Sequence, residues 1–110
     1  MDITEISSSG VHVAAMKGRL DTATAPAAEA KLLELLGSGG KVVADLAEVH
    51  YVSSAGLRVL LKAAKQAKSS GGGFAVAAPQ PPVREVLEIS GFDKILAIHP
   101  SRDAAVAGLA

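Results

Sequence analysis

The segment KVVADL, residues 41–46, constrains the fold more than any other part of the chain. It is short, contains adjacent β-branched valines, and is apolar on both sides of the pleat that a strand would have. Strands of this kind are covered on both faces, as central strands of parallel sheets are. Because parallel neighbours are joined by crossover helices, the segment predicts an α/β domain with helices before and after it.

The remaining strands and helices are expected to alternate along the chain. Residues 2–6 and 11–16 flank the turn SSSG and should pair as an antiparallel hairpin. Further strands are expected at 41–46, 74–78 and 95–98, and helices should begin near Pro26, at the turn of Ser53 and Ser54, at Pro81 and at Ser101. Gly91 should adopt the left-handed conformation after the third helix. We predict one α/β domain over residues 1–110, with a mixed, mostly parallel sheet of four to five strands and about four helices.

The helix after the serine turn should have an apolar face and a basic face. The predicted buried face follows i, i+3, i+4, i+7 spacing and consists of Leu57, Leu60, Leu61 and Ala64. The basic stripe on another face consists of Arg58, Lys62, Lys65 and Lys68. Either a solvated helix face or part of a partner surface would explain this stripe.

Composition narrows the classes of function. The 110 residues carry a formal net charge of zero, so no overall attraction to nucleic acid or to an anionic membrane is expected. There is no cysteine, and therefore no disulfide or thiolate metal site. The N-terminus lacks the apolar core of a signal peptide, and no apolar run approaches the roughly 20 residues that span a bilayer. We expect a soluble, cytoplasmic protein.

Catalytic and cofactor motifs are scarce. His12, His50 and His99 lack the spacing of a metal pair on one helix, and the serines have no G-x-S-x-G context. The glycine-rich segment at 69–73 precedes a strand, whereas phosphate-cradling loops follow one. We expect no enzyme activity, no metal and no cofactor. A small enzyme or a nucleotide-binding protein is the least favoured alternative.

The serine turn is the exception. One hydroxyl of Ser53 and Ser54 suffices to cap the helix that follows, which leaves the other available. The turn lies between a strand and a helix N-terminus, where free N–H groups and the helix dipole favour an anion. A serine there could accept a phosphate at little cost to the fold, with Gly56 keeping side-chain bulk away from the hydroxyls.

Residues 43–61, VADLAEVHYVSSAGLRVLL, resemble the central motif of the STAS-domain anti-sigma factor antagonists of bacteria. The resemblance extends upstream to KGRLD at 17–21, and downstream to VREVL at 83–87 and SGF at 90–92. It therefore covers essentially the whole chain. It implies a STAS-type fold and a role in regulating transcription through partner switching.

In that family, the unphosphorylated antagonist binds an anti-sigma factor that is also a serine kinase. Phosphorylation in the serine turn releases it, and a PP2C-type phosphatase reverses the modification. Neither direct nucleic-acid binding nor membrane binding is implied. The alternative within the family is a STAS module of a lipid-transport ATPase or a stressosome-like complex, without control by phosphorylation.

The resemblance also assigns site residues. Aligned on Gly56, the family's aspartate falls on Ser53, its first hydroxyl residue on Ser54 and its second on Ala55. Ser54 is therefore the expected phosphorylation site, with Ser53 as second choice. The expected partner-binding residues are Asp21, Thr22, Ser53, Ser54, Gly56 and Arg58. The Asp21 turn and the serine turn each precede a helix, so both should lie at the same end of the sheet. Asp45 and Gly91 are expected to be structural, Asp45 because it should end a buried strand and accept N–H groups from the following turn.

Overall fold

The computed structural model describes all residues, 1–110, and contains one five-stranded sheet. Its strands are β1 (Asp2–Ser8), β2 (Val11–Leu20), β3 (Lys41–Val52), β4 (Gly73–Ala77) and β5 (Ala97–His99), in that spatial order. β1 pairs with β2 as an antiparallel hairpin, and all other neighbours are parallel. The predicted mixed, mostly parallel sheet is confirmed.

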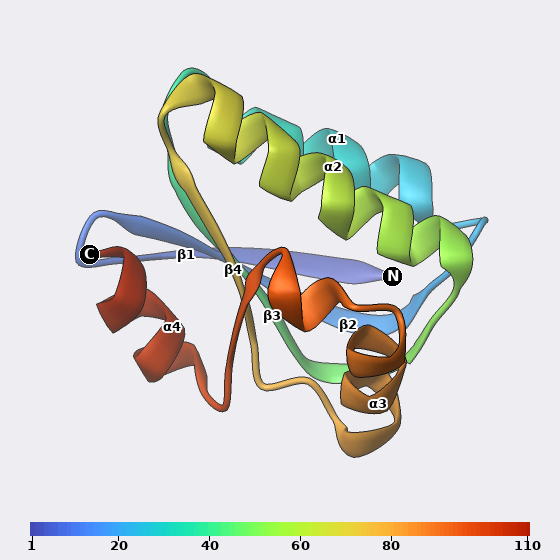
Figure 1. The fold of residues 1–110 in the computed structure, drawn as a ribbon. Helices are drawn as coiled ribbons and strands as arrows, with labels where there is room; N and C mark the ends of the chain where they lie inside the picture. The colour runs from blue at the N-terminus through green and yellow to red at the C-terminus, as the bar shows by residue number, and fades with distance from the viewer.

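Helices cover both faces of this sheet. They are α1 (Ala25–Leu36), α2 (Ser54–Ser70), α3 (Pro81–Ile89) and α4 (Arg102–Leu109), with a short 3₁₀ helix, η1 (Phe92–Lys94), after α3. α1 and α2 lie side by side on one face, and α4 lies on the opposite face (Figure 1). None of these helices combines the length and the hydropathy needed to cross a bilayer.

The alternation of side chains along β3 divides the core into two clusters. Val42, Ala44 and Leu46 belong to a cluster of 22 buried residues that includes residues of α1, α2 and α3. Val43 belongs to a smaller cluster of 7, which α4 covers. The double-sided apolar pattern of this segment therefore reflects burial on both faces, as predicted.

The predicted end of the central strand was wrong. β3 does not stop at Leu46 but continues to Val52, alongside a β2 that continues to Leu20. The register of this parallel pair shifts between Ala15 and Lys17 and again between Gly18 and Arg19. Each shift breaks the two-residue alternation on which a strand is recognised in a sequence, so the extension resembled a turn.

The predicted buried face of α2 was also partly wrong. Its fully buried positions are Gly56, Val59, Leu60, Ala63 and Ala67. Leu57, Leu61 and Ala64 are only half-buried at the edge of the core. Gly56, Ala63 and Ala67 let the helix approach the sheet closely, and Leu57 and Leu61 flank the contact. The basic stripe of Arg58, Lys62, Lys65 and Lys68 is exposed throughout.

The helix ends follow their expected chemistry. Gly91 has φ +75°, the left-handed conformation predicted for the residue after α3. The Ser101 hydroxyl accepts a hydrogen bond from the Ala104 N–H at 3.1 Å and so caps α4. The next residue, Arg102, is the first residue of α4, and its side chain joins this helix to β3 of the sheet through Asp45.

Asp45 is the one buried charged residue of the domain, with 5% of its surface exposed. Its Oδ2 accepts a 2.8 Å hydrogen bond from Nε of Arg102 and lies 2.8 Å from Nη2 of the same guanidinium in an ion pair. Its Oδ1 accepts a 3.0 Å bond from the Ala47 N–H. Asp45 lies within β3 rather than at its end, because the strand is longer than predicted. The expected N–H acceptance is present, and the ion pair to α4 is an addition that the sequence did not indicate.

We expect Asp45→Ala to lower the free energy of unfolding by about 1–3 kcal/mol, because it leaves the Ala47 N–H without its acceptor and Arg102 without its counter-ion. Urea denaturation would measure the change. Asp93→Ala, at an exposed position without a side-chain hydrogen bond or ion pair, is the matched control and should change little. An Asp45→Ala protein that kept its stability and lost only partner binding would contradict the structural role.

Candidate functional site

Two turns that are distant in sequence lie together at one end of the sheet. β2 and β3 are parallel and end opposite each other, with Leu20 paired to Val52. The Ser53 N–H donates a 2.9 Å hydrogen bond to the Leu20 carbonyl. The chain then enters the Asp21 turn after one strand and the serine turn after the other. The expectation that both turns lie at the same end of the sheet is met.

Ser53 is the residue that caps α2. Its backbone is extended, and its hydroxyl oxygen accepts a 3.3 Å hydrogen bond from the Gly56 N–H. Its carbonyl accepts the first helical hydrogen bond, from the Leu57 N–H at 2.9 Å. Ser53 is half-buried and its side chain is engaged in the fold.

Ser54 has a different environment. It is the first residue of α2, is exposed, and its hydroxyl makes no hydrogen bond within the chain. The backbone N–H groups of Ser54 and Ala55 also have no acceptor within the chain. A helix start with free N–H groups is a favourable place for an anion. The second serine of the turn is therefore the accessible one.

Gly56 is buried beneath the turn. A Cβ at this position would lie 2.6 Å from the Leu20 carbonyl oxygen and 2.8 Å from Leu20 Cγ. Only a residue without a side chain lets α2 start this close to the end of β2. We expected Gly56 to leave space around the hydroxyls and to belong to the partner-binding set. Because it is buried, its contribution is to position the turn.

Asp21 organises the neighbouring turn. Its Oδ1 accepts hydrogen bonds from the N–H groups of Ala23 at 3.0 Å and Thr24 at 3.2 Å. The Thr24 hydroxyl in turn donates to the Arg19 carbonyl at 2.7 Å and accepts from the Asp21 N–H at 2.9 Å. The hydrogen bond from the Thr24 N–H is the main cause that holds the pKa of Asp21 below its ordinary 3.8, and the Arg19 side chain acts in the same direction.

An exposed stack lies beside this turn. The Arg19 guanidinium is 4.3 Å from the centroid of the Tyr51 ring, and its Nε is 3.3 Å from Asp21 Oδ2. Tyr51 is 42% exposed, so its ring is accessible from solvent. Neither Arg19 nor Tyr51 was expected from the sequence to belong to the site. Their pairing depends on the irregular register of β2 and β3 and has no sequence signature of its own.

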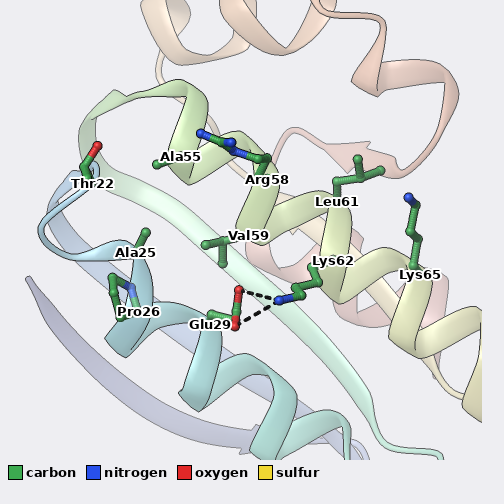
Figure 2. A pocket seen from close by; sticks show the side chains of 10 residues that line it. All are labelled: Thr22, Ala25, Pro26, Glu29, Ala55, Arg58, Val59, Leu61, Lys62 and Lys65. Atoms are coloured by element: carbon green, nitrogen blue, oxygen red, sulfur yellow. Dashed lines mark hydrogen bonds and ion pairs between the residues drawn. The ribbon is translucent and has the colours of Figure 1, made fainter.

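Thr22 and Arg58 lie at the rim of the turns and are both exposed. Both contribute to a groove of about 570 Å³ between α1 and α2. Arg58 extends back toward Ala55 and the start of α2 (Figure 2). It makes no ion pair, which leaves its charge available. Of the residues proposed from the sequence, Asp21, Thr22, Ser53, Ser54 and Arg58 are thus brought to one end of the domain.

The site offers binding groups but no assembled catalytic or metal centre. No three histidine, aspartate or glutamate side chains are placed to hold a metal ion together. The accessible groups are a hydroxyl, free backbone N–H groups and an unpaired guanidinium. These can bind an anion or carry a phosphate.

Comparison with known proteins finds a matching family model and relatives in both sequence and structure. The STAS domain family model matches residues 2–105. BtrV of Bordetella bronchiseptica, named as an anti-sigma factor antagonist, is 41% identical over 108 residues, covering 97% of this chain and 93% of BtrV. The crystal structure of an anti-sigma factor antagonist from Mycobacterium paratuberculosis is 28% identical, with a TM-score of 0.87 over 98% of this chain and 92% of that one. A Thermotoga maritima structure described in the same terms shares the fold, with a TM-score of 0.90 at 24% identity over 97% of this chain and 93% of that one.

Gly56→Ala should lower the free energy of unfolding by about 1–3 kcal/mol, because the added methyl group overlaps the Leu20 carbonyl. Replacing a glycine by alanine at an unobstructed helix position is neutral or stabilising, so a loss of stability in Gly56→Ala would report the steric overlap. Ser54→Ala, two residues earlier on the same helix, is the control and should leave stability nearly unchanged. Urea denaturation of both variants would measure this, and equal stability would show that the contact can relax.

Asp21 should stabilise the fold only while it is ionised. Its pKa in the folded protein is lowered, so its contribution is complete above the ordinary value of 3.8 and is lost as the pH falls through the folded pKa. The difference in urea midpoint between the wild type and Asp21→Ala should therefore be constant near neutral pH and shrink as the pH falls below 3.8 and through the folded pKa. Asp2→Ala, at an exposed aspartate without a side-chain hydrogen bond, is the control. A difference that persisted unchanged in acid would mean that Asp21 does not act through its charge.

Proposed function

The chain belongs to the STAS domain family, and on that premise we propose that it is an anti-sigma factor antagonist that phosphorylation of Ser54 switches off. The family is the one that the sequence motifs predicted. The names of its relatives from Bordetella bronchiseptica and Mycobacterium paratuberculosis support the antagonist role. The partner in this proposal is an anti-sigma factor, and the protein acts by binding it rather than by catalysis.

The observation that carries the choice of site is the different use of the two serines. Ser53 caps α2 with its hydroxyl and is half-buried, so modifying it would cost the helix its cap. Ser54 is exposed and makes no hydrogen bond through its hydroxyl. A kinase can therefore reach Ser54 without opening the fold. This assigns the second hydroxyl the phosphate-accepting role.

The surroundings of Ser54 suit a phosphate group. The modification adds about −1.5 to −2 charges at neutral pH. The free N–H groups of Ser54 and Ala55 and the α2 dipole can stabilise that charge. Arg58 lies one helical turn further on, within the i, i+4 spacing at which helix side chains interact. The fold should therefore barely change on phosphorylation.

The phosphate on Ser54 should weaken binding of the partner and leave the fold intact. A dianion in a closely packed interface must lose its hydration or meet carboxylates of the other protein, and either effect costs several kcal/mol. A loss of ~3 kcal/mol would weaken binding roughly a hundredfold. In this proposal the switch is steric and electrostatic blocking, and it requires no conformational relay through the domain.

The enzymes of the switch are part of the same proposal. The anti-sigma factor would also be the serine kinase, so that the antagonist is modified while it is bound. A PP2C-type phosphatase would remove the phosphate and restore binding. The exposed position of Ser54 at the tip of the domain leaves it accessible to both enzymes.

We predict opposite behaviour for the two serines. Ser54→Ala should bind the anti-sigma factor constitutively and accept no phosphate, with unchanged stability. Ser53→Ala should still accept phosphate but lose about 1 kcal/mol of stability through the missing cap. Ser54→Asp should bind weakly and keep a native circular dichroism spectrum.

The partner for these measurements would be purified from the source organism with the wild-type protein as bait and identified by mass spectrometry. Phosphotransfer is then followed by peptide mapping, and binding by calorimetry. Capture of a partner other than an anti-sigma factor would refute the proposed function. Phosphotransfer to Ser54→Ala at the wild-type rate would move the site to another hydroxyl, and large backbone shifts far from the turn would replace blocking with allostery.

A further inference from the structure

The groove between α1 and α2 is built from two matching stripes of side chains. On α1 it is lined by Ala25, Pro26 and Glu29, with Thr22 just before the helix. On α2 the lining includes Ala55, Arg58, Val59, Lys62 and Lys65. Both sets follow the spacing of a single helix face. The two helices lie side by side, with Val59 and Lys62 of α2 pointing toward α1 and with Arg58 and Lys65 along the outer edge of α2 (Figure 2).

The shape of the groove favours an elongated occupant. Its α2 wall extends from residue 55 to residue 65, which corresponds to roughly 15 Å along the helix axis. This is about three helical turns. Two neighbouring helices present such a trough to a third helix, which packs into it at the usual interaxial distance of about 8–10 Å.

The chemistry of the lining is amphipathic and strongly biased in charge. The floor contains small apolar groups, of which Ala25 and Val59 are buried. The walls carry three cations and one carboxylate, that of Glu29. Glu29 is already paired with Lys62, whose Nζ lies 3.3 Å from both of its oxygens. Arg58 and Lys65 have no counter-ion in the chain.

We propose that this groove binds an acidic, amphipathic helix of a protein partner. The apolar face of that helix would contact the floor, and its carboxylates would pair with Arg58 and Lys65. The exposed Lys62–Glu29 pair is weak enough to rearrange during binding. If the proposed function holds, the helix belongs to the anti-sigma factor. Only this identity of the partner rests on the proposed function.

The position of Arg58 links the groove to the phosphorylation site. It lies at the end of the groove nearest Ser54, and its side chain extends toward the first turn of α2 (Figure 2). A phosphate on Ser54 would attract the same guanidinium that the acidic helix needs. Modification would then oppose binding in two ways, by repelling carboxylates and by occupying Arg58.

A partner of the nucleic-acid class fits less well. Its single strands are usually held by aromatic side chains on which bases stack, and the groove contains none. The net charge of the whole domain is zero, so long-range attraction to a polyanion is also absent. The cations of the groove, Arg58, Lys62 and Lys65, all lie on α2, so they suit a partner segment about as long as the groove.

The first test needs no knowledge of the natural partner. A synthetic helical peptide of about 20 residues, with leucines on one face and glutamates flanking them, is titrated into the isotope-labelled protein and followed by NMR. Backbone signals of the α1 and α2 residues that line the groove should shift. A peptide in which every glutamate is replaced by lysine should leave them unchanged.

Two charge reversals on α2 provide a matched pair. Lys65→Glu changes a groove residue, and Lys68→Glu makes the same change one turn on, outside the lining. Lys65→Glu should weaken peptide binding about tenfold or more, and Lys68→Glu by less than about threefold. The same ratio is expected for the anti-sigma factor, measured by calorimetry.

Each other outcome has a definite meaning. Absence of peptide binding, shifts confined to another surface, or equal effects of the two reversals would overturn the proposal. Tighter binding of an oligonucleotide at the groove, or a dimer of this chain that Lys65→Glu dissolves, would assign the groove to a different occupant and overturn it as well. If the anti-sigma factor does not bind the wild-type protein, the proposed function fails. The peptide titration then still tests whether the groove binds an acidic helix.

Discussion

The hydrogen bond from the Ser53 N–H to the Leu20 carbonyl joins the two turns on which the candidate site depends. It forms because β2 and β3 are parallel and end level with each other. The same carbonyl oxygen would lie 2.6 Å from a Cβ at residue 56, so the glycine there is a condition of the arrangement. One backbone oxygen therefore sets where α2 begins and where the Asp21 turn lies beside it.

A turn fixed in this way is well suited to carrying a charge switch. The groups that hold it are backbone atoms, the Ser53 hydroxyl and the Asp21 carboxylate, all of them engaged within the chain. Ser54 and Arg58 lie outside this network and are exposed. A phosphate can therefore be added without removing any interaction that stabilises the fold. In our proposals the phosphate weakens binding at the surface that a partner contacts, which extends from the serine turn along the groove between α1 and α2.

Much of the fold could be predicted because local patterns and global packing agree. The apolar run at 41–46 indicated a strand buried on both faces, and the strand is indeed covered by helices on both sides. The capping residue Ser101 and the left-handed Gly91 marked helix boundaries through local chemistry alone. Predictions failed where the pattern was interrupted. The register shifts between β2 and β3 hid the second half of β3, and the buried face of α2 includes small residues in place of Leu57 and Leu61.

The sequence by itself determined the order of the elements, the serine turn and the basic stripe on α2, because each depends on residues close together in the chain. It also indicated the family, through a motif that is continuous from residue 43 to residue 61. Only the tertiary structure decided which serine is free. The Ser53 hydroxyl is engaged by the Gly56 N–H, and the Ser53 N–H is held by the carbonyl of Leu20, which lies 33 residues earlier in the chain. The Asp45–Arg102 pair, separated by 57 residues, and the groove between α1 and α2 were likewise settled by folding, since sequence patterns carry no record of which distant side chains will meet.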